Sequence, residues 1–363
     1  MDTYPVGLRK EELDTPVLCL DIDALDKNIE KMAGYFAERP ASLRPHTKTH
    51  KCPLIAQMQL RAGAIGVTCA KLGEAEAMAQ AGIRDILIAN QIIGPRKITR
   101  LVNLAAYTDV MVAVEDETNA LALSEAAQTK GVELRVLVEV DVGMGRCGTA
   151  PEEPSLRLAK RLVSLSGLRF EGIMGYEGHA VMIEDFQERE KAAQEAMAKL
   201  IATRDFIEER GIEVKIVSGG GTGTYQITGN YPGVTEVQVG SYATMDARYR
   251  SVGIDFHQAL TVVTQVISTR GTDHAITDAG MKTVTPEFGM PRVLDPKGWK
   301  VTKLAEEHGF LQRENGRPLR PGDTVELIPS HGCTTINLHD AYYVTRDGIV
   351  EAVWPIAARG AIR

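Results

Sequence analysis

The chain has 363 residues, of which 44% are hydrophobic and 25% charged, a composition typical of a globular protein with room for more than one core. Its net charge of −7 argues against a nucleic-acid partner, because such a partner needs a basic surface. No apolar run reaches the ~20 residues of a membrane helix, the segment 1–14 lacks the features of a signal peptide, and five irregularly spaced cysteines favour a reducing cytoplasm.

Short apolar segments alternate with amphipathic ones over the first two thirds of the chain. Eight segments are predicted strands, at residues 43–48, 64–70, 85–90, 109–114, 134–140, 170–176, 214–218 and 236–240. Helices are predicted between them, at residues 72–81, 95–105, 117–130, 154–164 and 183–210, several of them ending at a glycine. Eight β-α units over roughly 200 residues predict a (β/α)8 TIM-type barrel. An open doubly wound sheet is the alternative.

The pattern changes after about residue 254. Residues 260–270 are rich in β-branched side chains, residues 324–329 and 341–345 look like strands, and Asp347-Gly348 predicts a hairpin turn. We therefore expect a barrel domain over residues 15–253 and a β-rich C-terminal domain over residues 254–363. Residues 1–25 are candidates to join the second domain.

The first predicted strand ends in the basic run Arg44-Pro45-His46-Thr47-Lys48-Thr49-His50-Lys51. A basic run is usually a solvent-exposed surface, but barrel enzymes carry out their chemistry at the C-terminal ends of the strands. The nearby cationic side chains of His46, Lys51 and Arg44 are expected to favour a neutral amine on Lys48, and a neutral amine is what attacks an aldehyde. Lys48 is therefore a candidate to hold an aldehyde cofactor as a Schiff base.

A glycine-rich loop, Ser218-Gly219-Gly220-Gly221-Thr222-Gly223, follows the seventh predicted strand. Glycines let backbone N–H groups approach an anion, and barrels commonly bind phosphate after strands 7 and 8. The eighth strand ends in Gly240-Ser241-Tyr242, which could supply further donors to that phosphate. A flexible loop is the alternative. A lysine and a phosphate cradle in one pocket are what pyridoxal 5'-phosphate requires.

Two other strand ends carry polar side chains. Arg146 lies on a glycine-flanked loop after the fifth strand and could hydrogen-bond the phenolic oxygen of the cofactor. Tyr176 ends the sixth strand and is a candidate cofactor-binding residue, and His179 is a candidate general base. A surface arginine and a structural histidine are the alternative interpretations.

The β-rich domain contains the pair His331 and Cys333. An H-x-C spacing puts an imidazole and a thiolate on one face of an extended segment, and these ligands suit zinc or another divalent ion. Two ligands would leave substrate and water to complete the coordination shell, with His339 and Asp340 as candidate supporting residues. A buried cysteine beside an ordinary histidine is the alternative.

In this order, the motifs around Lys48, Arg146, Gly219–Gly223 and His331 resemble those of the D-threonine aldolase and D-serine dehydratase family. This family comprises fold-type III pyridoxal-phosphate enzymes related to alanine racemase, and the resemblance covers residues 15–363. It implies an alanine-racemase-like barrel with a C-terminal β domain, pyridoxal phosphate on Lys48 and Arg146 facing the cofactor ring oxygen. It also implies a divalent metal (Zn, Mn or Mg) on His331 near the hydroxyl of a small-molecule D-amino acid substrate, and a homodimer.

The motifs point to two different reactions within this family. Cys333 matches the dehydratases, because related aldolases usually have aspartate there. The motifs Thr47-Lys48-Thr49-His50-Lys51, Gly143-Met144-Gly145-Arg146, Tyr176-Glu177-Gly178-His179 and Val353-Trp354-Pro355-Ile356 look more like the aldolases. We predict an aldolase that cleaves D-3-hydroxy amino acids to glycine and an aldehyde, with Lys48 and His179 catalytic. A D-serine or D-3-hydroxyaspartate dehydratase, which gives a 2-oxo acid and ammonia, is the alternative. A racemase and a non-catalytic pyridoxal-phosphate-binding barrel fit less well.

Overall fold

The computed structural model describes residues 5–363, so the first four residues of the segment 1–25 considered above lie outside the described part. The chain divides into two compact units. The barrel unit consists of Met32–Lys48, Ile55–Gly240 and Ala361–Arg363. The β unit consists of the N-terminal segment up to Lys31, Thr49–Leu54 and Ser241–Gly360. Both units are therefore built from stretches that are far apart in the sequence.

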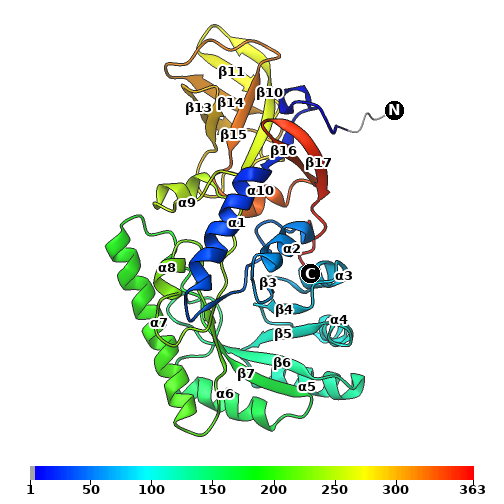
Figure 1. Cartoon of the computed structure of the whole chain (residues 1–363), viewed down its shortest axis with the longest axis vertical. Coiled ribbons are helices and arrows are strands. Elements are labelled where there is room, and N and C mark those ends of the chain that lie inside the picture. The colour runs from blue at the N-terminus through cyan, green and yellow to red at the C-terminus, as the bar shows by residue number, and fades with distance from the viewer. Residues whose placement is uncertain (1–4) are drawn as a thin grey trace. The chain divides into compact units, whose positions relative to one another are not determined.

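A parallel sheet forms the centre of the barrel unit, as predicted (Figure 1). Its strand order is β2-β9-β8-β7-β6-β5-β4-β3, and a bridge between His46 and Thr68 joins the two ends of this order. The predicted (β/α)8 architecture is confirmed. The strands are β2 (Ser42–Leu43), β3 (Val67–Cys69), β4 (Asp85–Ile88), β5 (Asp109–Val114), β6 (Leu134–Glu139), β7 (Leu168–Met174), β8 (Ile216–Gly219) and β9 (Glu236–Val237).

The β2 ladder is shorter than the predicted strand 43–48 because of Pro45. Proline has no N–H to donate, so the regular ladder ends at Leu43. The chain nevertheless stays in register, because the N–H groups of Arg44 and His46 donate to the carbonyls of Val237 and Val239. Lys48 therefore lies where a longer strand would have ended.

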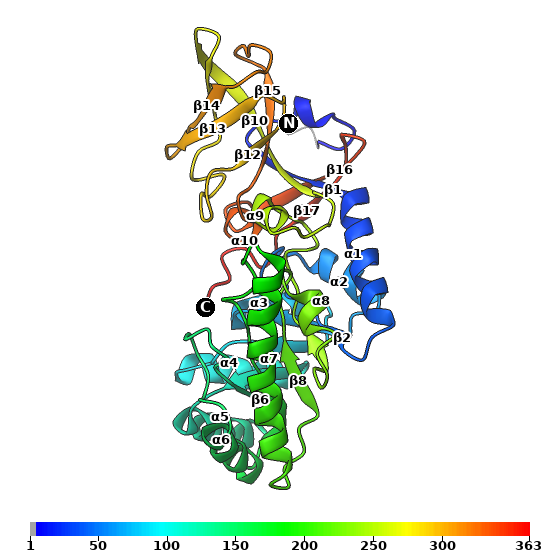
Figure 2. The same ribbon diagram turned by 90° about the vertical axis from the view of Figure 1, so that its left-hand side faces the viewer.

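Helices follow the strands and cover the outside of the sheet. Helix α7 packs on β7 and β8, and α4 lies beside α5 (Figure 2). The helix α5 ends at Gly131 in the left-handed conformation, which is the predicted glycine stop. The helices are α2 (Pro53–Arg61), α3 (Leu72–Gln80), α4 (Pro95–Ala105), α5 (Glu117–Lys130), α6 (Glu153–Ser164), α7 (Phe186–Glu208) and α8 (Tyr225–Thr228).

Buried ion pairs hold the strands together at their N-terminal ends. Arg44 is 2% exposed, and its guanidinium lies 2.9 Å from Glu236 and 2.7 Å from Asp85, the first residues of β9 and β4. Arg135 of β6 lies 3.4 Å from the same Asp85 carboxylate. The suggestion that Arg44 crowds Lys48 is therefore wrong, because its side chain is held at the opposite end of the strands.

The β unit is a mixed sheet whose main order is β13-β14-β11-β10-β1-β16-β17, with β15 paired to β10 and β12. Asp347 and Gly348 both have positive φ and form the predicted hairpin turn. No helix within residues 5–363 is long and apolar enough to cross a bilayer. The strands are β1 (Val17–Asp21), β10 (Leu260–Arg270), β11 (His274–Thr277), β12 (Arg292–Asp295), β13 (Trp299–Leu304), β14 (Gly309–Arg313), β15 (Thr324–Ile328), β16 (Ala341–Arg346) and β17 (Ile349–Pro355).

Three helical segments belong to the β unit alone, and a further helix, like α2, has residues in both units. They are the 3-10 turn Lys10–Glu12, α9 (Ala247–Ser251), α10 (Gly332–Ile336) and the crossing helix α1 (Ile22–Ala37).

Candidate active site

Lys48 and Arg146, two candidate residues from the sequence, lie near the ring of a third, Tyr176, in the barrel unit. Tyr176 follows β7, Lys48 follows the β2 segment, and Arg146 lies on the loop after β6. The Nζ atom of Lys48 lies 5.8 Å from the centre of the Tyr176 ring, and the guanidinium carbon of Arg146 lies 5.5 Å from it. The strand ends thus bring a candidate nucleophile and a candidate anion-binding group together.

Arg146 has a buried acidic partner that sequence reasoning missed. Its guanidinium lies 3.4 Å from the carboxylate of Glu139, the last residue of β6. Gln91 also donates a hydrogen bond to Glu139. Burial raises the pKa of Glu139, while the bonds from Gln91 and Arg146 act in the opposite direction. Only the folded barrel brings these residues together, since Gln91 follows a different strand.

The glycine loop after β8 packs against the same tyrosine. A Cβ added to Gly221 would lie 3.3 Å from the Tyr176 ring, and one added to Gly223 would lie 1.9 Å from the carbonyl oxygen of Val181. Side chains at these positions would fill the loop. Ser218 and Thr222 are buried, and Ser218 accepts a hydrogen bond of 2.8 Å from Gln238. The loop is therefore a closely fitted backbone cradle.

These groups are chemically suited to pyridoxal phosphate. The cofactor needs an amine for its aldehyde, a cation near its ring oxygen and a cradle for its phosphate, and Lys48, Arg146 and Gly219–Gly223 are such groups. Of the other predicted donors, Gly240 ends a barrel-unit stretch, whereas Ser241 and Tyr242 belong to the β unit. Tyr242 is fully buried there, with its ring 5.6 Å from that of Phe256.

His179, the candidate base, is exposed on a turn after β7. Its Cε1 atom would lie 3.4 Å from a Cβ on Gly143, a residue of the loop that carries Arg146. The imidazole of His179 is thus close to the loop that carries Arg146.

The candidate metal pair lies after β15 in the β unit. An extended segment was expected here, but the structure has a helix, α10, and His331 is its N-cap residue. Asp246 accepts a hydrogen bond of 2.8 Å from Nδ1 of His331 and one of 3.2 Å from the N–H of Gly332. The hydroxyl of Thr49, the residue after Lys48 in the chain, lies 3.3 Å from the sulfur of Cys333.

The electrostatics of this pair come from its neighbours. Burial by itself would lower the pKa of His331, but Cys333 and Asp246 raise that pKa to about 11. A carboxylate bonded to one imidazole nitrogen is the usual support of a metal-bound histidine, because it fixes the ring and directs the other nitrogen outward. Asp246 has this position, whereas His339 instead bonds the carbonyl of Thr283 at 2.8 Å. Sequence reasoning missed Asp246, which no motif marks.

The donor set suits a divalent ion with an incomplete protein shell. Imidazole nitrogen and thiolate sulfur are typical zinc ligands. Within residues 5–363 no group of three or more His, Cys, Asp and Glu side chains is arranged to hold a metal. An ion at His331 and Cys333 would therefore need substrate and water as further ligands.

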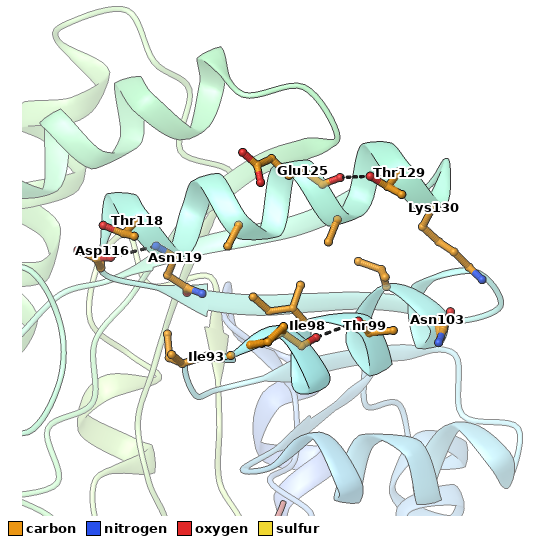
Figure 3. A pocket seen from close by; sticks show the side chains of 15 residues that line it. Ile93, Ile98, Thr99, Asn103, Asp116, Thr118, Asn119, Glu125, Thr129 and Lys130 are labelled. Atoms are coloured by element: carbon orange, nitrogen blue, oxygen red, sulfur yellow. Dashed lines mark hydrogen bonds between the residues drawn. The ribbon is translucent and has the colours of Figure 1, made fainter.

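A groove of about 620 Å³ lies elsewhere in the barrel unit, between α4 and α5 (Figure 3). Its lining is mostly apolar and includes Ile93, Ile98 and Asn119. None of the candidate site residues predicted from the sequence lines this groove. Barrel enzymes place their chemistry at the strand ends, so we do not assign the reaction to this groove.

Two family models match the chain. Residues 20–248 match the model described as alanine racemase, N-terminal domain, and residues 259–345 match the putative serine dehydratase domain.

Curated relatives match almost the full length. The chain is 38% identical over 365 residues to 3-hydroxy-D-aspartate aldolase of Paracoccus denitrificans (strain Pd 1222), covering 98% of this chain and 94% of that protein. It is 38% identical over 356 residues to D-threonine aldolase of Arthrobacter sp., covering 97% and 94%. D-threo-3-hydroxyaspartate dehydratase of Delftia sp. (strain HT23) is 28% identical over 368 residues, covering 93% and 96%.

A solved structure has the same fold over the whole chain. The crystal structure of D-threonine aldolase from Filomicrobium marinum superposes with a TM-score of 0.95 at 35% identity, covering 99% of both chains.

Proposed function

This chain belongs to the family of the alanine racemase N-terminal domain, and on that premise we propose that it is an aldolase cleaving D-3-hydroxy amino acids to glycine and an aldehyde. The observation that carries the proposal is the 38% identity to two such aldolases over nearly the full chain. The grouping of Lys48 and Arg146 around Tyr176 supports it, because that grouping suits the cofactor of this family.

In the proposed reaction Lys48 would hold pyridoxal phosphate covalently, and Arg146 would hydrogen-bond the ring oxygen. Tyr176, whose ring lies near both residues, would bind the cofactor as well. The loop from Ser218 to Thr222 would receive the phosphate, with Gly240, Ser241 and Tyr242 as further donors. When bound, the cofactor accepts the electron pair released at the substrate Cα as the Cα–Cβ bond breaks.

His331 and Cys333 would hold a divalent ion, with Zn, Mn and Mg as candidates. An ion held there lowers the pKa of a coordinated hydroxyl group. His179 would take the proton of the substrate β-hydroxyl, which becomes the aldehyde oxygen. The homodimer and the cytoplasmic location stay predictions from the sequence.

A dehydratase is the second candidate, favoured by Cys333 and by the match of residues 259–345 to a putative serine dehydratase domain. Here Lys48 would remove the α-proton, and the β-hydroxyl would leave. The same residues therefore serve either reaction, and the products distinguish them.

A product assay tests the proposal. The full-length protein, supplied with pyridoxal phosphate and Mn²⁺ or Zn²⁺, should convert D-threonine to glycine and acetaldehyde. Lys48→Ala should lower the rate by about 10³-fold or more, because the residue touches the reacting cofactor. The exposed Lys97 provides the matched control, since Lys97→Ala should keep full activity. Ammonia and a 2-oxo acid without glycine would establish the dehydratase instead.

A further inference from the structure

A buried acidic side chain lies beneath the glycine loop. Glu177, which follows Tyr176 in the chain, has no exposed surface. Its carboxyl group accepts a hydrogen bond of 3.1 Å from the N–H of Gly220. It also accepts bonds of 2.6 Å from the hydroxyl of Thr224 and 2.5 Å from that of Thr228. One side chain from the end of β7 thus holds the loop after β8 and the helix α8 beyond it.

These bonds determine the role of two backbone N–H groups of the loop, those of Gly220 and Gly221. The N–H of Gly220 is taken by Glu177, and the N–H of Gly221 donates to the hydroxyl of Thr224 at 3.2 Å. Gly220 also has a φ of +83°, and a Cβ there would lie 2.5 Å from Val237. These two N–H groups were expected to face phosphate, but they instead fix the shape of the loop.

We propose that Glu177 is the positioning residue of the phosphate loop, holding residues 220–228 in the conformation that receives the cofactor phosphate. This inference rests on the proposed function, because it assigns that loop to pyridoxal phosphate. A loop shaped before binding loses less conformational entropy when the phosphate arrives, so the cofactor binds more tightly.

The sign of the effect separates positioning from simple electrostatics. A carboxylate near a phosphate repels it, so removal of its charge alone would strengthen phosphate binding. Loss of positioning has the opposite result, because a neutral amide in place of the acceptor cannot hold all three donors. Glu177→Gln therefore tests the two effects against each other.

The experiment compares pyridoxal phosphate with pyridoxal, which lacks the phosphate. Dissociation constants of both are measured by equilibrium dialysis on the full-length protein freed of cofactor. In Glu177→Gln we expect pyridoxal phosphate to bind about tenfold more weakly, the effect of roughly one hydrogen bond, with pyridoxal binding unchanged. Thr228→Val removes one donor from outside the loop and should act in the same direction with a smaller effect.

Glu171→Gln is the matched control, because Glu171 is a buried glutamate within β7, the strand that Glu177 follows, and its partners are Arg169 at 2.7 Å and Arg135 at 3.5 Å rather than the loop. In Glu171→Gln the ratio of the dissociation constants of pyridoxal phosphate and pyridoxal should equal that of the wild type. An unchanged ratio or tighter pyridoxal phosphate binding in Glu177→Gln overturns the inference while leaving the proposed function intact. If Glu177→Gln does not fold, the ratio in Thr228→Val decides. A wild-type protein that binds neither compound overturns both proposals.

Discussion

Cys333 and the carboxylate of Asp246 together keep the proton on His331, against the effect of burial. With Cys333 beside it, the imidazole keeps its proton well above neutral pH, at a pKa of about 11. A divalent ion must therefore displace a proton, and protons compete with the ion. Metal binding at His331 and Cys333 thus depends on pH.

We expect Zn²⁺ affinity to rise with pH, by about tenfold per unit around neutrality, because about one proton leaves for each ion bound. Isothermal titration calorimetry in buffers of different ionisation enthalpy measures this proton release. Asp246→Asn should weaken Zn²⁺ binding and reduce the release. Asp340, a candidate supporting residue in the sequence, is instead 87% exposed and pairs with Arg359 at 2.8 Å, so Asp340→Asn should change neither. Zn²⁺ binding without proton release would contradict the assignment.

The raised pKa of His331 also makes the stability of the metal-free protein depend on pH. A raised pKa stabilises the folded state fully below the unfolded-state pKa of about 6.5, and this contribution is lost as the pH rises toward about 11.

At the residue scale, the sequence allowed Lys48, Tyr176 and Arg146 to be placed near one another, because each follows a strand of a recognisable barrel. It could not reveal Glu139, Glu177 or Asp246 as supporting residues. Gln91, Gly220, Thr228 and His331, which bond these carboxylates, come from other strands or from distant segments, so the sequence does not show the pairing. Supporting contacts of this kind require the folded structure.

At the element scale, the apolar periodicity located the barrel strands and the helices α3 to α7. The strand end at Pro45 and the helix α10 were missed for local reasons. The apolar pattern of a strand does not reveal that Pro45 lacks an N–H group for the ladder. Helix α10 spans only Gly332–Ile336, which is too short to show an amphipathic repeat.

Helix α5 allows a stability prediction, because both of its ends are capped. Asp116 accepts a hydrogen bond of 3.0 Å from the N–H of Asn119, so Asp116→Ala should lower the free energy of unfolding by about 1 kcal/mol. Glu125→Ala changes an exposed acid on the same helix and should cost less than about 0.5 kcal/mol. Urea titrations followed by circular dichroism would measure both, and equal losses would rule out the capping role.

At the scale of the whole molecule, the ion pairs of Arg44 connect the first strand of the barrel to strands far along the chain. Breaking a buried pair leaves its partner without a countercharge, so Arg44→Ala should cost about 3–5 kcal/mol of unfolding free energy. Arg169 pairs with Glu133 and Glu171 but is half exposed, and Glu171 keeps Arg135 at 3.5 Å as a second partner, so Arg169→Ala should cost no more than about 1 kcal/mol. Guanidinium unfolding of both variants measures this difference, and similar midpoints would show that the Arg44 pairs do not stabilise the barrel.

The sheet order of the β unit has a consequence during synthesis. Strand β1 pairs with β10 and β16, which the ribosome makes much later. At roughly 5–20 residues per second, the nascent chain carries β1 for on the order of ten seconds or more before β10 emerges. Leu18 and Leu20, fully buried in the finished protein, lack their strand partners during that time. Strand β1 thus completes its pairing only when almost the whole chain has been made.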